Sequence, residues 1–294
     1  MAQTSQLTAA GWGFVGAGAV LALVALVLAA MAPGETRLAA WARRYGFELT
    51  EINRPVVSRY LRKTRTLQAA GAGLGFLASP IYVGISERPF PLGDSWVALA
   101  IGGYLVATVV AEATFLRSRT PNSVRGAALL PRSLADYVPK AAIWAIRILP
   151  LVSVGLAVLY GVVPKNPQRP LDPSSTFLLV ASALLVTFAI AIETTLRAIV
   201  ARPQPAMIED AVEADDAVRA SSIHGLSGAS VALMLLTGGW ELVSAGEVTS
   251  VTILSQVLPW LGVLVDVTAL AAWIFIGHPR SWRVDREVAA VNAR

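Results

Sequence analysis

The residues best suited to chemistry are carboxylates at the ends of long apolar segments. Glu35, Glu112 and Glu193 each lie where such a segment ends. In a membrane, carboxylates of this kind bind cations or relay protons, or they anchor a helix at the interface. The first interpretation predicts an acidic cluster around a pseudo-threefold axis. The second predicts local ion pairs, such as Glu193 with Arg197 four residues later. The residues alone leave both interpretations open.

A fourth carboxylate, Asp266, lies near the middle of the last apolar run, which covers about 251–277. A charged Asp at such a depth costs about 2.5–3.5 kcal/mol on insertion scales. Arg147 is a basic residue well inside another apolar run, about 141–163. We therefore expect Asp266 to face the interior of a helix bundle and to pair with Arg147, directly or through water. Such a pair would act as a structural latch or as a gate or proton site.

The elements that must position these side chains are membrane helices. The chain has 294 residues, of which 55% are hydrophobic and 15% charged, whereas soluble domains carry about 25% charged residues. Its apolar runs are about 20 residues long, which is the length needed to cross a hydrocarbon core. They cover about 10–32, 67–85, 96–116, 141–163, 176–200, 226–240 and 251–277.

The basic residues predict the orientation of these helices. Of the 24 Lys and Arg residues, only Arg88, Lys165 and Arg169 fall in the loops predicted to be outside. Since basic loops stay in the cytoplasm, the N-terminus is expected outside and the tail 278–294 inside. The net charge of +5 then reflects topology, and no nucleic-acid partner is expected. Arginine far outnumbers lysine, which is typical of a GC-rich bacterial genome and predicts a bacterial inner membrane.

An internal repeat organises the chain. Each of the three glutamates precedes, by 25 residues, a position in the next helical segment: Tyr60, Tyr137 or Val218. Arg37, Arg117 and Arg197 are also spaced 80 residues apart. We interpret this as three αα-hairpins over about 10–85, 96–163 and 176–240, followed by the final helix 251–277 and the tail. The predicted fold is an all-α, polytopic bundle of seven transmembrane helices in one domain, 1–294.

Local signals mark where several helices begin, end or pack. Gly46 is expected to end a short helix, and Asn53 to begin the next, because the following Arg-Pro is tolerated in a first turn. Ser133 opens a Ser-x-x-Asp capping pattern that predicts the start of the fourth helix. Gly71 and Gly75, four residues apart, predict close approach of a neighbouring backbone.

The sequence contains no recognisable catalytic motif. Residues 11–16 match the dinucleotide-binding pattern G-x-G-x-x-G, but they lie in an apolar run with no preceding strand, so close helix packing is expected instead. Cysteine is absent, and two histidines, His224 and His278, are too few for a histidine-rich metal site. We therefore expect no enzymatic activity, no cofactor and no metal. We predict a non-catalytic membrane subunit or partner of a transport or export assembly. It would contact the lipid bilayer and, through its inner loops, a cytoplasmic or membrane protein. The alternative is a small secondary transporter or channel that uses the intramembrane carboxylates, since such proteins often contain repeats.

Overall fold

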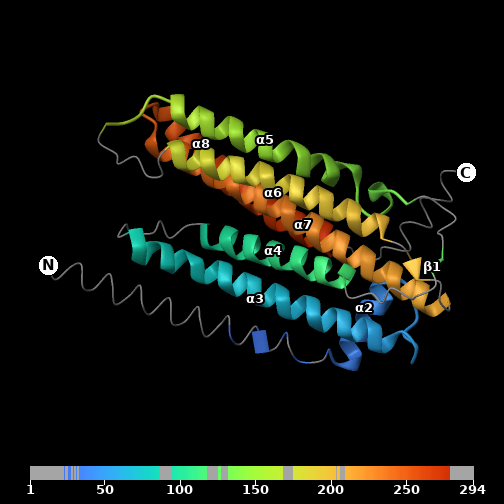
Figure 1. The fold of residues 1–294 in the computed structure, drawn as a ribbon. Helices are drawn as coiled ribbons and strands as arrows, with labels where there is room; N and C mark the ends of the chain where they lie inside the picture. The colour runs from blue at the N-terminus through green and yellow to red at the C-terminus, as the bar shows by residue number, and fades with distance from the viewer. Residues whose placement is uncertain are drawn as a thin grey trace, which may run out of the picture. The chain divides into compact units, whose positions relative to one another are not determined.

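The computed structural model describes residues 33–86, 95–117, 125–126, 132–167, 175–202, 204–205 and 209–278, with Leu23, Leu26, Val27, Ala29 and Met31. Seven α-helices, α2–α8, contain most of these residues (Figure 1). Residue contacts divide the chain into two compact units. The first contains 1–127 and 204–218, and the second contains 128–203 and 219–294.

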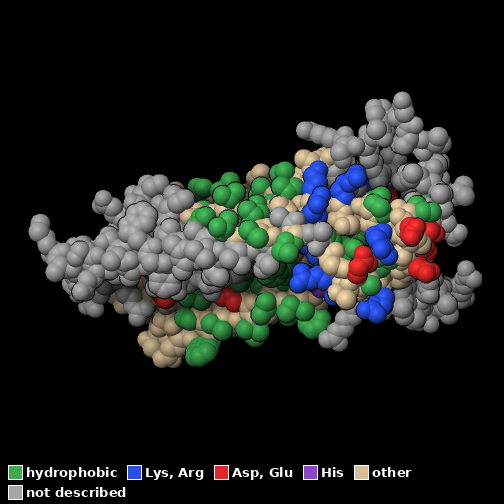
Figure 2. All heavy atoms as spheres, turned by 90° about the horizontal axis from the view of Figure 1, so that it is seen from below, with side chains coloured by type: hydrophobic (Ala, Val, Ile, Leu, Met, Phe, Trp, Pro, Cys, Tyr) green, Lys and Arg blue, Asp and Glu red, His purple; other side chains and the backbone are tan. Residues whose placement is uncertain are grey.

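Four of the described helices are long and apolar enough to cross a membrane. They are α5 (Lys140–Val162), α6 (Ser175–Ala201), α7 (Glu209–Val248) and α8 (Thr252–Gly277). Leu151, Leu184 and Leu264 on these helices are each at least 60% exposed. In the described part of the face drawn in Figure 2, hydrophobic side chains lie together, with Lys and Arg gathered to one side of them. Exposed apolar surface of this extent is expected of a protein that contacts lipid.

The all-helical membrane class is thus confirmed, and the count of seven spans stays a prediction. The first predicted run, 10–32, lies almost wholly outside the described residues. α4 (Ser95–Arg117) contains a shorter apolar stretch, Ala98–Thr114. α2 (Glu35–Tyr45) has 11 residues, about 16 Å at 1.5 Å per residue, which is too short to cross a bilayer.

The first unit contains α2, α3 (Arg54–Ser86) and α4, and one two-residue antiparallel pairing of β1 (Arg125–Gly126) with β2 (Gln204–Pro205). α2 ends as predicted at Gly46, whose positive φ of 68° suits glycine. α3 begins directly after Asn53, also as predicted. The Oδ1 atom of Asn53 accepts the backbone N–H of Thr50 at 2.9 Å, and its Nδ2 donates to the Glu48 carbonyl at 2.9 Å.

Glycines bring α3 and α4 into backbone contact. A side-chain carbon at Gly71 would overlap the carbonyl oxygen of Gly103, and one at Gly75 would overlap that of Leu99. The predicted close approach is therefore confirmed. The contact pairs the helices of the second and third apolar runs, which the repeat prediction placed in different hairpins. α5 and α6 also pack together, and they too come from different predicted hairpins. The threefold repeat stays a prediction.

The second unit is a bundle of α5, α6, α8 and the greater part of α7. At one end of it, the connection after α5 meets the connection between α7 and α8. Asn166 N–H donates to the Val248 carbonyl and Ser250 N–H to the Pro164 carbonyl, both at 2.9 Å. We call this the 163–175 end, because α5 ends and α6 begins there.

The predicted start of the fourth helix needs correction. The pattern at Ser133 does form a capping box, but it opens a 3-10 turn, Leu134–Asp136, and α5 begins only at Lys140. Pro139 explains the interruption, because proline disfavours helical backbone at the residue before it. The helix therefore restarts after Pro139.

α7 is longer than the sequence predicts at both ends. It begins at Glu209, inside the segment 201–223 expected to be a loop, and it ends at Val248 rather than near Trp240. The last turns stay helical because they are packed: Ala245 and Val248 are 4% and 3% exposed. Glu241, expected in an outer loop, thus lies inside the helix.

One side of α7 is a glycine face packed on α8. A side-chain carbon at Gly228, Gly239 or Gly246 would overlap Gly277, Asp266 or Pro259 of α8, respectively. These glycines are 11 and 7 residues apart, which is close to three and two helical turns. Because glycine has no side chain, the two helix backbones approach closely along their length.

Candidate functional site

Glu241 is a buried carboxylate at the meeting point of three helices. Its side chain extends from α7, and the residue is 1% exposed. Its Oε1 atom accepts a hydrogen bond from Ser153 Oγ of α5 at 2.7 Å and from Ser182 Oγ of α6 at 2.8 Å. No Lys, Arg or His in the described part of the chain bonds to it. The carboxyl group is therefore held by neutral hydroxyls alone.

Ser182 can support either protonation state of Glu241. Ser182 Oγ lies 2.8 Å from Glu241 Oε1 and 2.9 Å from the Leu178 carbonyl oxygen. A hydroxyl has one proton, so Ser182 donates to one of these acceptors at a time. When Glu241 is ionised, donation to Oε1 is favoured. When Glu241 is protonated, the Ser182 proton can turn to the Leu178 carbonyl, and the hydroxyl oxygen remains an acceptor.

An apolar seal closes the bundle on one side of this site. The seal consists of Ala157, Tyr160, Leu178, Ala245, Val248 and Leu258, all at most 9% exposed. The seal lies about one helical turn from the site, toward the 163–175 end. Ala157 is four residues from Ser153, Leu178 four from Ser182, and Ala245 four from Glu241. Apart from the Tyr160 hydroxyl, these side chains offer no polar partner for water. The carboxylate is thus separated from that end of the bundle.

Hydroxyl groups continue from Glu241 in the opposite direction along α7. Thr237, Ser230 and Ser227 lie within about 40° of Glu241 around the helix at 100° per residue. Ser227 and Ser230 are fully buried. Ser230 Oγ donates to the Leu226 carbonyl, whereas Ser227 Oγ has no hydrogen-bond partner in the described part of the chain. We call these three residues the hydroxyl stripe. It is interrupted by Met234.

Asp266 faces the interior of the bundle, as predicted, but it does not pair with Arg147. It lies against Gly239 on the glycine face of α7. Arg147 is instead paired with Glu193 across the α5–α6 contact, with Nη2 at 2.7 Å from Oε1 and Nε at 3.3 Å from Oε2. A direct Asp266–Arg147 pair is therefore wrong, because Glu193 on the neighbouring helix α6 binds the guanidinium instead. Glu193 also accepts Arg197 at 2.5 Å, which confirms the predicted pair four residues apart.

The other two glutamates have different surroundings. Glu35 is 70% exposed and lies 3.4 Å from Arg54. Glu112 is fully buried in the first unit and accepts the Tyr60 hydroxyl at 3.3 Å. Glu35 and Glu112 belong to the first unit and Glu193 to the second. The three glutamates therefore have different chemical environments, although their sequence spacing is the same. Glu35 forms an exposed ion pair, Glu112 a buried hydrogen bond and Glu193 a partly exposed ion pair.

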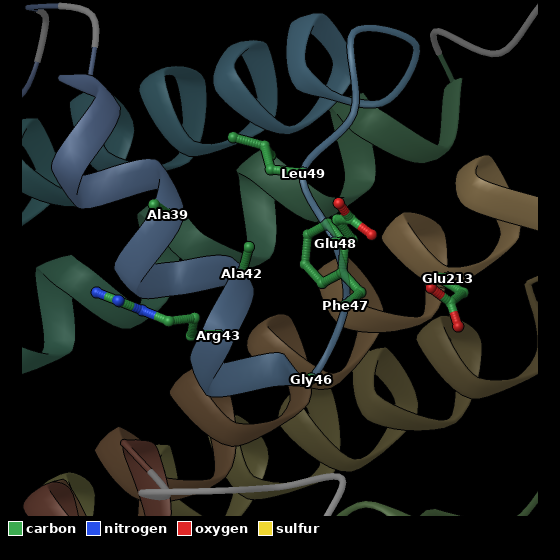
Figure 3. Close-up of a pocket in the computed structure, with 8 residues that line it drawn as sticks. All are labelled: Ala39, Ala42, Arg43, Gly46, Phe47, Glu48, Leu49 and Glu213. Atoms are coloured by element: carbon green, nitrogen blue, oxygen red, sulfur yellow. The ribbon is translucent and has the colours of Figure 1, made fainter.

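The first unit also contains an open cavity of about 530 Å³ beside the end of α2 (Figure 3). It is lined by Arg43, Phe47, Leu49 and two carboxylates, Glu48 and Glu213. Figure 3 shows Arg43 pointing away from both carboxylates. Across the described part of the chain, no three His, Asp or Glu side chains converge as a metal site. The cavity offers mixed polar and apolar surface without an evident catalytic set.

Sequence reasoning missed Glu241, Ser153 and Ser182. Glu241 follows Trp240, and the pair has the polarity of a membrane boundary. One sequence signal could have placed Glu241 inside a helix. No proline occurs between Glu209 and Pro259, so a helix can continue past Glu241. In comparisons with known proteins, no family model, curated protein or solved structure matched the chain.

Proposed function

We propose that this protein is a small secondary transporter or channel of the cell membrane that binds and releases a proton at Glu241. The observation that supports this is a buried carboxylate whose only bonded partners in the described part of the chain are two serine hydroxyls. An ionisable group inside a membrane bundle is costly, and in most cases it serves an ion pathway, a proton relay or a binding site.

Proton exchange requires that both forms of the carboxyl group be tolerated. Ser182 supplies this because its proton has two acceptors within 2.9 Å. Exchange also requires a route to one side of the membrane. The apolar seal blocks the 163–175 end, so we assign access to the hydroxyl stripe at Thr237, Ser230 and Ser227. A rearrangement of the seal would then open the other side, as alternating access demands.

The orientation proposed for this cycle follows from the basic loops. The 163–175 end contains few basic residues, whereas Arg132, Lys140 and Arg197 lie toward the opposite end of α5 and α6. By the positive-inside rule, the opposite end is cytoplasmic. The N-terminus is then outside and the C-terminus inside a bacterial inner membrane, and the proton reaches Glu241 from the cytoplasm in the sealed state.

The proposal is tested with the purified full chain in liposomes that contain a pH-sensitive dye. A potassium diffusion potential, negative inside, drives protons inward. We expect faster acidification than in protein-free liposomes, and a return to the protein-free rate with Glu241→Gln. Glu247→Gln is the matched control, because Glu247 is an exposed carboxyl group on the same helix. Wild-type flux in Glu241→Gln would show that this residue is not the proton site.

A second candidate is a non-catalytic membrane subunit of a transport or export assembly. The observation that favours it is the open cavity at the end of α2, whose apolar side chains Phe47 and Leu49 and carboxylate Glu213 could receive a segment of a partner protein. The liposome experiment separates the two candidates. A subunit that depends on a partner produces no flux above that of protein-free liposomes, whereas a transporter or channel does so alone.

A further inference from the structure

We propose that the second unit binds the phosphate group of an anionic phospholipid in a basic pocket between α5 and α6. The pocket is a cavity of about 360 Å³. Its lining includes the basic residues Arg132, Arg147 and Arg197 and the apolar residues Leu134, Ile143 and Val200. The three arginines come from three different segments: the chain before α5, α5 itself and α6. This site is independent of Glu241 and of the transport proposal.

Two arginines of the basic pocket, Arg147 and Arg197, retain donors for an anion. Glu193 accepts hydrogen bonds from Nε and Nη2 of Arg147 and from Nη2 of Arg197. Nη1 of Arg147, and Nε and Nη1 of Arg197, have no partner in the described part of the chain. The two arginine side chains are 39% and 68% exposed, so these groups can be reached. Two guanidiniums against one carboxylate leave one excess positive charge, and planar N–H donors suit phosphate oxygens.

The negative end of α6 does not oppose an anion here. The last carbonyls of a helix carry partial negative charge and would repel phosphate. Arg219, which is fully buried in α7, donates from Nη1 to the carbonyl oxygens of Ile199, Val200 and Arg202 at 3.2, 2.8 and 2.9 Å. One guanidinium therefore neutralises the end of α6 beside the basic pocket.

The surroundings of the basic pocket indicate a lipid rather than a free anion. Trp144 is 57% exposed and its ring lies 5.4 Å from the Arg147 guanidinium carbon, and tryptophan is enriched at the headgroup level of membranes. Next to the arginines, Ile148, Leu151 and Ile190 expose 49, 63 and 61% of their surface. Leu151 is one turn beyond Arg147 on the same side of α5. A ligand with a phosphate at the arginines can therefore lay its acyl chains along this apolar surface, as expected of basic pockets between membrane helices.

The experiment measures lipid binding to the purified full chain by native mass spectrometry in mild detergent. Phosphatidylglycerol, phosphatidylcholine and inorganic phosphate are titrated separately, and phosphate is also added as a competitor. We expect phosphatidylglycerol to bind more tightly than phosphatidylcholine. Arg197→Gln should weaken its binding about five-fold, the effect of one basic residue at an anionic surface. Glu193→Gln, which removes the competing carboxylate, should strengthen it to a similar extent.

Lys140→Gln is the matched control. Lys140 is exposed on α5, two turns from Arg147, and does not line the basic pocket, so its loss should change the Kd less than two-fold. Equal losses in Arg197→Gln and Lys140→Gln would overturn the proposal in favour of general surface charge. Equal binding of the two lipids would overturn it as well. Displacement of phosphatidylglycerol by millimolar phosphate would show that a free anion is the ligand and would overturn the lipid assignment. A Glu193→Gln variant that binds no more tightly would contradict the proposed role of the arginines.

Discussion

Neighbouring glycines of α7 give opposite predictions for the same substitution. An ideal Cβ at Gly239 overlaps Asp266 Oδ1 and lies 3.0 Å from both Asp266 Cγ and the Gly262 carbonyl oxygen. An ideal Cβ at Gly238 meets only Leu156 Cδ1, at 3.9 Å, which is ordinary contact. Gly239→Ala must therefore displace the Asp266 side chain or move α8, whereas Gly238→Ala fits without movement.

The magnitude follows from two terms. Replacing a helical glycine by alanine stabilises the helix by up to about 1 kcal/mol, and this gain is common to both variants. Forcing an extra carbon into a packed contact costs about 1–3 kcal/mol, and only Gly239→Ala has this cost. The difference between the two variants therefore isolates the cost of the overlap. It corresponds to unfolding midpoints separated by about 2–10 °C.

Thermal unfolding in detergent, followed by tryptophan fluorescence, measures this difference, since the chain has 8 tryptophans. Gly238→Ala should equal or exceed the wild type, and Gly239→Ala should fall below it. Adding Asp266→Ala to Gly239→Ala should recover part of the loss, because it removes the overlapping side chain. Equal midpoints for the two single variants would refute the close packing of α7 on α8.

Two further predictions address the end of α6 and the orientation in the membrane. Arg219→Gln should lower the free energy of unfolding by about 2–4 kcal/mol, because it removes a buried charged donor from three carbonyl oxygens. Arg44→Gln, at an exposed position, should leave the unfolding curve unchanged. In intact cells, Ser250→Cys should react with a membrane-impermeant thiol reagent while Lys140→Cys should not. The reverse pattern of labelling would place the C-terminus outside.

The positions of the membrane helices could be predicted because burial in lipid requires a run of apolar residues of fixed length. α5, α6 and α8 begin and end within about two residues of the apolar runs that predicted them. α3 and α7 are longer than their runs. Hydropathy marks the part of a helix that suits the bilayer, whereas the helix itself continues wherever its backbone hydrogen bonds and packing persist. A polar residue such as Glu241 can therefore lie inside a helix beyond its apolar run.

Side-chain partners were harder to predict than helices. The sequence offers more than one acidic partner for Arg147. Whether it pairs with Asp266 or with Glu193 depends on which helices are neighbours. Because α5 packs on α6, Glu193 lies on the adjacent helix and forms the ion pair with Arg147. Periodicity gives the side of a helix on which a residue lies, but it does not say which helix faces that side. The spacing of the three glutamates shows the same limit, since equal spacing leads to unequal environments.

The two sides of α7 suggest where movement in the proposed cycle would occur. Its contact with α8 is made at Gly228, Gly239 and Gly246. Gly228 packs on the backbone of Gly277, Gly239 packs on Asp266 and the Gly262 carbonyl, and Gly246 packs on the Pro259 ring. Such close contacts leave no room for sliding without overlap. At the depth of the site, its contact with α5 and α6 is instead made by a few hydrogen bonds centred on Glu241. Protonation changes those bonds and leaves the glycine contacts untouched. A proton at Glu241 would therefore shift α5 and α6 relative to an α7–α8 pair that moves as one body.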